Sequence, residues 1–275
     1  MAVPVYASPI ERIWYYLLRL ICAAVLLFLI SPILAIMPLS FNSVPFFTYP
    51  MPGLSLRWYE DFFLTDRWQG ALRNSIFVAS STTVLATVLG TLAALGLSRS
   101  NFPFRTAVMS MLISPIVVPV VITAVGMYFF YADVGLLNTY TGLILAHTTL
   151  AAPFVVITVT ATLIGFDHSL SRAAAGLGAP PTTVFFKVIL PLILPGMISG
   201  ALFAFGTSFD EVVVVLFVAS PEQRTLPKVM FAGIREMISP TITAAATVLI
   251  LVSIGMLTTV ELLRRRSDRL RGIRA

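Results

Sequence analysis

The segments LSRAAAGLGA (residues 170–179) and KVILP (residues 187–191) form a polar interruption in an apolar chain and decide which fold is expected. The three consecutive alanines favour a short helix with a low-profile face. Gly178 permits the backbone reversal that starts a second short helix, and Pro180 and Pro181 fit its first turn, where a missing N–H costs nothing. A protein that only sat in a bilayer would not need such an element. The pattern therefore predicts a rigid contact surface between two apolar spans.

The composition predicts an all-helical integral membrane protein. Of 275 residues, 58% are hydrophobic and only 11% are charged, and the mean hydropathy is +0.95. Soluble domains carry about 25% charged residues. A helix needs about 20 apolar residues to cross the hydrocarbon core, and the runs here do not alternate as the strands of a transmembrane barrel do. Six transmembrane helices are expected, at residues 17–39, 74–97, 106–131, 142–164, 196–218 and 241–263.

Basic residues predict that both termini lie in the cytoplasm. In that orientation 12 of the 18 Lys and Arg residues fall in cytoplasmic segments, as the positive-inside rule requires. We expect a cytoplasmic N-terminal segment (1–16), a transmembrane domain (17–263) that contains the polar element (about 166–191), and a basic cytoplasmic tail (264–275). The tail directly follows a span, so its basic run is expected to meet membrane lipid and not nucleic acid. A short interfacial helix is expected at 56–64.

Two prolines, Pro115 and Pro119, lie four residues apart in the third expected span. Each lacks a backbone N–H, so the pair is expected to bend or loosen that helix. A hinge beside a translocation path and an ordinary packing kink both fit the pattern.

Two adjacent acids, Asp210 and Glu211, fall inside the fifth expected span. Counted from the start of that span at about 1.5 Å per residue, they lie past the bilayer midplane. A charge at the bilayer centre costs about 2.5–3.5 kcal/mol even on the lenient insertion scale, so both acids need a reason. They could attract a cation on a permeation path, or anchor neighbouring helices, for which Arg73 and Asn74 are available. Adjacent residues point about 100° apart on a helix, so the two acids need not share a role.

The spacing of the polar element resembles the EAA motif of type I ABC importer permeases, which is Glu-Ala-Ala, three residues, Gly, nine residues, Ile-x-Leu-Pro. The spacing is fully kept, but Arg172 stands at the acidic position and Val188 at the isoleucine position. The resemblance implies a coupling loop on which an ATPase subunit docks, and Arg172 then implies an acidic residue on that ATPase. The residues that the resemblance assigns to the coupling loop are Arg172, Ala173, Ala174, Gly178, Phe185, Lys187 and Pro191.

A broader resemblance, over about residues 70–263, is to the second permease of spermidine/putrescine importers. It rests on 208–218 and the loop after it, on Ile238-Ser239-Pro240, and on 146–154. It implies a multi-pass subunit of a bacterial-type cytoplasmic (inner) membrane that passes a small, cationic solute from an extracytoplasmic solute-binding protein. A second permease, alike or distinct, and an ATPase dimer complete the implied complex. Relatives in this group carry opines or phosphonates, which stay as alternatives. The implied solute path runs along Ser208, Phe209, Asp210 and Glu211.

The chain carries no motif for chemistry of its own. It has no GxxxxGK[ST] phosphate loop, no paired catalytic carboxylates, no nucleophile elbow and no HExxH helix. We therefore expect no enzyme activity and no metal or cofactor in this chain, with ATP and Mg held by the partner ATPase. A self-sufficient channel or ion-coupled carrier and a membrane anchor for a cytoplasmic complex are the competing functions. A channel or carrier would leave the coupling loop without a purpose. An anchor would use the loop for docking but would not predict solute uptake that depends on it.

Overall fold

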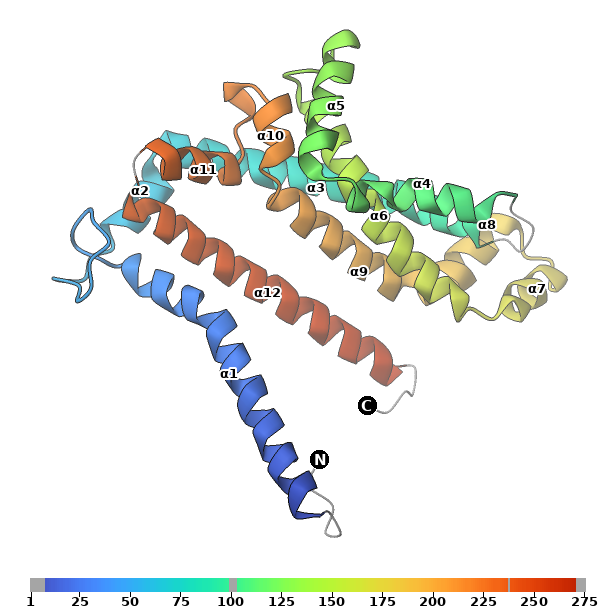
Figure 1. Cartoon of the computed structure of the whole chain (residues 1–275). Coiled ribbons are helices and arrows are strands. Elements are labelled where there is room, and N and C mark those ends of the chain that lie inside the picture. The colour runs from blue at the N-terminus through green and yellow to red at the C-terminus, as the bar shows by residue number, and fades with distance from the viewer. Residues whose placement is uncertain (1–7, 99–102, 237, 271–275) are drawn as a thin grey trace. The chain divides into compact units, whose positions relative to one another are not determined.

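The computed structural model describes residues 8–98, 103–236 and 238–270, and the regular secondary structure in these ranges is helical, apart from an isolated bridge between Asn42 and Leu54 (Figure 1). The all-helical prediction is thereby confirmed. Parts of three predicted segments lie outside the described residues: 1–7 of the N-terminal segment, 271–275 of the basic tail, and Arg99 among the cytoplasmic basic residues. The long helices are α1 (Pro9–Leu39), α3 (Asp66–Leu97), α4 (Arg105–Val117), α5 (Val120–Asp133), α6 (Tyr140–Ile164), α9 (Leu190–Phe209) and α12 (Pro240–Leu270). The shorter elements are α2 (Arg57–Leu64), α7 (His168–Gly176), α8 (Pro181–Val184), the π-helical turn η1 (Phe185–Ile189), α10 (Val213–Val218), the 3₁₀ turn η2 (Pro221–Gln223) and α11 (Leu226–Glu236).

Within the described residues, five helices are long and apolar enough to cross a membrane, and six spans result when α4 and α5 count as one. α4 and α5 meet at 103°, with Val118 between them and Pro119 as the N-cap of α5. Pro115 lies inside α4, one turn before the break. The prediction that the prolines bend the third span is confirmed, and the bend is a full break. A hinge role for the pair stays a prediction.

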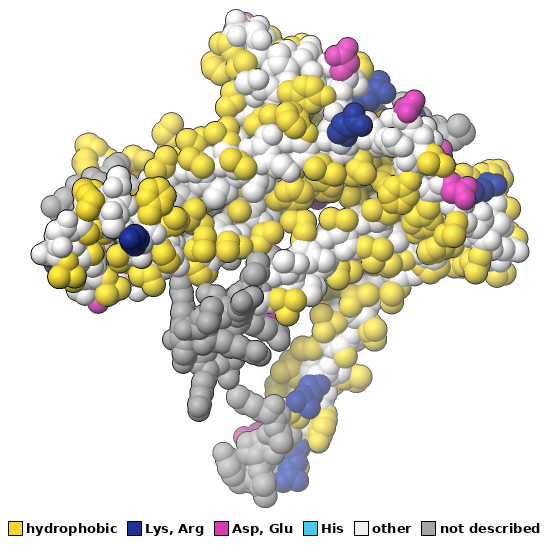
Figure 2. All heavy atoms as spheres, turned by 180° about the vertical axis from the view of Figure 1, so that it is seen from behind, with side chains coloured by type: hydrophobic (Ala, Val, Ile, Leu, Met, Phe, Trp, Pro, Cys, Tyr) yellow, Lys and Arg dark blue, Asp and Glu magenta, His cyan; other side chains and the backbone are white. Residues whose placement is uncertain are grey.

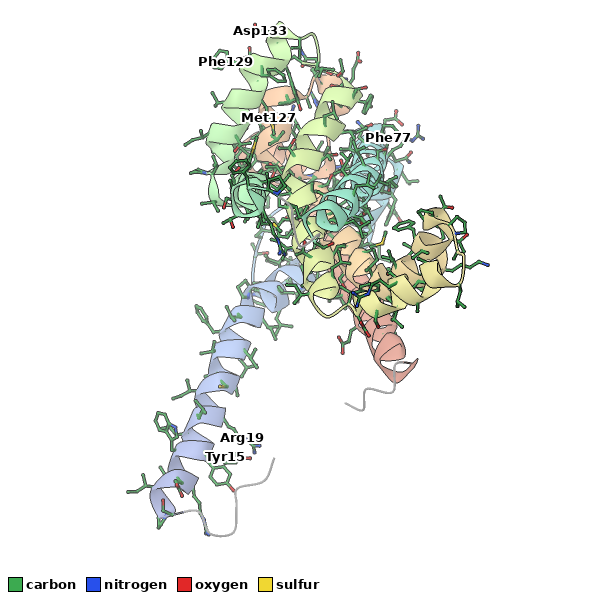
Figure 3. The ribbon with its side chains drawn as sticks, turned by 90° about the vertical axis from the view of Figure 1, so that its right-hand side faces the viewer. Tyr15, Arg19, Phe77, Met127, Phe129 and Asp133 are labelled. Atoms are coloured by element: carbon green, nitrogen blue, oxygen red, sulfur yellow. The ribbon has the colours of Figure 1, made fainter. Side chains whose placement is uncertain are left out.

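Two parts of the chain are each compact: residues 1–63 with 237–249, and residues 64–236 with 250–275. In the first part, α1 has no buried residue, and the Arg19 guanidinium lies 4.1 Å from the centroid of the Tyr15 ring (Figure 3). α2 forms where the short helix was predicted, and the Thr241 hydroxyl donates to Asp61 at 2.7 Å.

The core of the second part consists of α3, α6 and α9, which pack closely because small residues face one another. A Cβ on Gly90 of α3 would lie 2.7 Å from Val155 Cβ, and a Cβ on Gly200 of α9 would lie 2.5 Å from Thr158 Oγ1. Helices that pack in a membrane gain from such close backbone approach. Buried small residues recur every four positions on both helices, at Thr82, Ala86, Gly90 and Ala94 of α3 and at Gly196, Gly200, Ala204 and Ser208 of α9.

The predicted fifth span, 196–218, is wrong at both ends. The helix continues without a break from Pro181 through η1 into α9 and stops at Phe209, and Asp210–Val212 separate it from α10. Counted from Leu190, α9 has 20 residues and measures about 30 Å, the thickness of the hydrocarbon core. The two acids therefore lie at the end of α9, at the break that separates it from α10.

Hydrophobic side chains cover most of the face seen in Figure 2, and charged side chains are few there. The exposed hydrophobic side chains of the molecule include valine, leucine and phenylalanine residues of α3, α5 and α9. A surface of this kind suits contact with lipid or with another membrane subunit.

Candidate coupling element and solute site

The polar element forms two short helices joined by a left-handed glycine. The Asp167 side chain caps α7 by accepting from Ser169 N at 2.8 Å. Gly178 has φ +83°, a conformation that favours glycine, and its N–H donates to Ala175 O at 2.9 Å. Pro180 is then the N-cap of α8, and Pro181 its first residue. The predicted reversal at Gly178 and the predicted helix start are both confirmed.

The predicted coupling residues lie on the surface of this element. Arg172, Ala173, Gly178, Lys187 and Pro191 are exposed, and Ala174 and Phe185 are half-buried. Sequence analysis missed one large apolar side chain beside them, Leu177, which is 89% exposed; Phe186, next to the predicted Phe185, is 62% exposed. Leu177 directly precedes the motif glycine, and that position on a low-profile turn was the available signal. Exposed apolar residues on a polar element indicate a surface that a partner covers.

The element connects mechanically to the span that follows it. α7 packs on α8 and η1, and these continue without interruption into α9. α9 in turn packs on α6 through Gly196, where an added Cβ would collide with the Thr162 hydroxyl, and through Gly200. The second short helix of the element and α9 therefore form a single helical run.

At the far end of that run, the two adjacent acids have different surroundings. Asp210 is exposed and forms the C-cap of α9, with its N–H donating to Gly206 O at 3.1 Å. Glu211 is half-buried, and its Oε1 accepts from Val214 N at 2.9 Å. Phe209 stacks on Phe205, with ring centroids 5.3 Å apart and planes 16° apart. The carboxylate of Glu211 thus binds the backbone of α10, whereas Asp210 is exposed.

Ser208 faces the opposite way, into the helix core. Its hydroxyl lies 2.8 Å from His147 Nδ1 of α6, and both side chains are buried. His147 therefore packs against a hydroxyl group of another helix. The neighbouring Thr148 instead donates to the carbonyl of Ile144. His147 Nε2 has no hydrogen-bond partner among the described residues.

The loop after α10 is tied to α3 by its backbone. Asn74, which the sequence offered as a partner for the acids, instead donates to Glu222 O at 2.8 Å and to Arg224 O at 3.0 Å. Lys228 of α11 donates to Val215 O at 3.1 Å and to Ala219 O at 2.9 Å, at the C-terminal end of α10. Sequence analysis missed this role, because a basic residue in an outer loop carries no sign of which carbonyls it binds. Burial, and then the charge of Arg224, lower the pKa of Lys228 below its ordinary value.

No group of three or more His, Cys, Asp or Glu side chains gathers within the part of the chain that the structure describes.

The chain resembles proteins of known activity over most of its length. It is 34% identical over 241 residues to the spermidine/putrescine transport system permease protein PotC of Haemophilus influenzae, which covers 88% of this chain and 93% of that protein. It is 35% identical over 240 residues to the putrescine transport system permease protein PotI of Escherichia coli K12, which covers 83% of each.

Among solved structures, a bacterial ABC transporter involved in the import of the acidic polysaccharide alginate superposes with a TM-score of 0.71 at 16% identity, covering 94% of this chain and 98% of that chain. The predicted permease fold is therefore confirmed. Residues 86–270 match the family described as "binding-protein-dependent transport system inner membrane component", which also confirms the predicted inner-membrane location. The chain belongs to this family of inner-membrane transport components.

Proposed function

We propose that this chain is the second permease subunit of an ATP-driven importer that moves a small, cationic solute of the polyamine class into the cytoplasm. The observation that carries the proposal is the single helical run from Pro181 to Phe209. One end of this run continues the coupling element, and the other end presents Asp210. A transporter driven by a partner subunit needs a rigid element that links its docking surface to its solute site, and this helical run does so across about 30 Å. The polyamine permeases among its relatives support the choice of solute.

In this proposal the coupling loop receives one subunit of an ATPase dimer, which binds the ATP and Mg. The docking residues are those predicted, with Leu177 and Phe186 as added apolar contacts. Closure of the ATPase dimer draws the coupling loops of two permeases together, and α9 moves with the loop. The result is rigid-body rocking between outward-facing and inward-facing states, biased by ATP on the partner. Both termini lie in the cytoplasm, and the broken α4–α5 span flexes at Pro115 and Pro119.

The solute leaves an extracytoplasmic receptor and meets Asp210 beside the stacked pair Phe205 and Phe209. A carboxylate and an aromatic face together attract an alkylammonium group, by charge and by cation–π interaction. An anionic solute such as a phosphonate would be repelled by the same carboxylate, so the exposed acid favours the cationic class. Of the other predicted path residues, Ser208 is buried against His147 and Glu211 accepts from the backbone of α10, so neither offers a free group to the solute.

The test is reconstitution with the second permease and the ATPase, followed by measurement of ATP hydrolysis with receptor and candidate solutes. Stimulation by receptor loaded with spermidine or putrescine is the expected result. Stimulation only by an opine or phosphonate would support the importer function but contradict the polyamine solute class. Uptake that proceeds without ATP would overturn the importer and favour a channel or ion-coupled carrier. An anchor predicts assembly with the ATPase and no uptake.

A further inference from the structure

We propose that Glu211 and Lys228 are positioning residues that hold α10 at its two ends, so that Asp210 alone of the two acids meets the solute. This inference rests on the proposed function for the role of Asp210. Asp210 then binds the solute, and its neighbour Glu211 caps α10. Lys228, which lies outside the predicted solute path, holds the other end of α10.

The N-terminal end of α10 is capped by Glu211. The first N–H groups of any helix lack partners within it, and the Glu211 carboxylate accepts from one of them, that of Val214. A negative charge at this end also complements the positive pole of the helix dipole. A six-residue helix is too short to be stable alone, so such a cap contributes a large share of what holds it.

The C-terminal end of α10 is capped by Lys228. Its Nζ donates to the carbonyl of Ala219 just beyond the end of the helix and to that of Val215, which also accepts from the N–H of Ala219. The positive charge complements the negative pole of the helix dipole. Lys228 is half-buried, so its three donors have limited access to water and depend on these carbonyls.

Packing fixes the position of the capped helix. Val214 and Val218 are fully buried in a cluster with Ala124 and Tyr131 of α5, and Val215 is fully buried against α3 and α6. The Val218 carbonyl also accepts from the N–H of Asn138, in the turn between α5 and α6, at 3.0 Å. α10 is therefore a fixed block, and the break at 210–212 lies between it and α9.

Asp210 remains exposed at this break because its neighbour supplies the cap. If α10 came loose, the chain could extend α9 through the break and turn Asp210 away from its present direction. The capping charges thus act on the solute only through the placement of Asp210. Glu211 is needed as a hydrogen-bond acceptor and not as a free charge.

The experiment compares matched neutralisations of the two acids in the complete complex, with putrescine-loaded receptor. Glu211→Gln keeps a side-chain oxygen for Val214 N–H, so uptake is expected to stay within about twofold of the parent. Glu211→Ala removes the acceptor, and uptake is expected to fall at least about fivefold, the equivalent of one lost helix cap. Asp210→Asn keeps the shape but is expected to lower uptake about tenfold, because a charge-assisted contact is lost.

At the other end, Lys228→Met keeps the apolar stem and removes the donor, and it is expected to lower uptake about fivefold. Lys228→Arg keeps donors at that position and is expected to retain more uptake than the Met variant. In Glu211→Ala and Lys228→Met the maximal uptake rate is expected to fall. The apparent affinity for loaded receptor should stay the same, because the surface that binds the receptor is unchanged.

Hydrogen exchange of the amides in residues 212–219 tests the caps without any solute. Exchange is expected to be about fivefold faster in Glu211→Ala and Lys228→Met, and unchanged in Glu211→Gln and Asp210→Asn. The amides of α6 should exchange at the parent rate in all four variants, which separates a local effect from misfolding.

Two results would overturn the inference. One is a loss of putrescine uptake in Glu211→Gln as large as in Asp210→Asn, which would make the charge of Glu211 part of the path. The other is unchanged exchange of α10 in both Glu211→Ala and Lys228→Met, which would mean that packing alone holds the helix. Failure of the proposed function would show instead as a parent complex that takes up no putrescine, and the exchange comparison would still decide the role of the caps.

Discussion

The two ends of the helical run Pro181–Phe209 are built by different means. Its start follows Gly178 and two prolines, whose backbone conformations are set by residue type alone. Its end at Asp210 is set by side chains: one acid caps the next helix, and a lysine 17 residues further on holds that helix from its other end. At the start of the run, we expect substitutions other than at the glycine to have little effect on the structure. At its end, we expect any substitution that removes a charged partner to alter the structure.

The largest effect is expected at the start of the run. Gly178→Asp puts a side chain where φ is +83°, at a strain of about 1–2 kcal/mol, and adds a charge to the docking surface. We expect uptake to be abolished while the protein still reaches the membrane, as measured by uptake assays and immunoblots of membrane fractions. Gly176→Ala is the matched control, because an added Cβ there meets no atom within 4 Å. Normal uptake by Gly178→Asp would refute the coupling-loop assignment.

The middle of the run comes next, since it carries the motion from one end to the other. In Gly200→Val the new Cβ would lie 2.5 Å from Thr158 Oγ1 and 2.9 Å from Val155 Cα, so α6 and α9 must separate. Overpacking of this kind costs about 1–3 kcal/mol, and we expect a lower thermal midpoint together with strongly reduced uptake. Gly206→Ala, which meets no atom within 4 Å, should leave both unchanged. An unaltered midpoint in Gly200→Val would mean that close helix contact does not hold this core.

The charged end tests the solute class. Asp210→Asn should lower transport of a cationic solute about tenfold and transport of a neutral solute far less, because only the cation loses a charge-assisted contact. Competition uptake with both solutes gives the ratio directly. Asp133→Asn, another exposed acid at a helix end, serves as the control. Equal losses for both solutes would move Asp210 to a structural role.

The same contrast explains how far the sequence could be interpreted. A short helix over the three alanines, the turn at Gly178 and the start of a second helix at Pro180 and Pro181 were predicted, because alanine, glycine and proline act through their own backbone preferences. The end of the fifth span was misplaced, because Val212–Val218 extend the apolar run and hydropathy cannot distinguish a continuing helix from a new one.

The task of Lys228 was out of reach for a different reason. Its partners are backbone carbonyls, and any residue type could supply them. Likewise, the separate surroundings of Asp210 and Glu211 follow from where α10 packs, and that packing depends on α3, α5 and α6. The local pattern predicted that the two acids need not share a role but could not assign the roles.

The smallest expected effect concerns Ser208, two residues before the charged end. Ser208→Ala preserves the small buried surface that α9 presents to α6 but removes the hydroxyl that lies 2.8 Å from His147 Nδ1. One buried hydrogen bond contributes about 0.5–1.5 kcal/mol, so for a chain of this size the thermal midpoint should fall by only about 2–4 °C. His147→Leu in the same background provides the double-mutant cycle that isolates the pair. If the end of the run depends on paired side chains, amide exchange should rise in residues 206–210 and stay unchanged around Gly178. If amide exchange in Ser208→Ala rises equally in residues 206–210 and around Gly178, the two ends of the run are coupled. The proposed contrast between its ends would then be wrong.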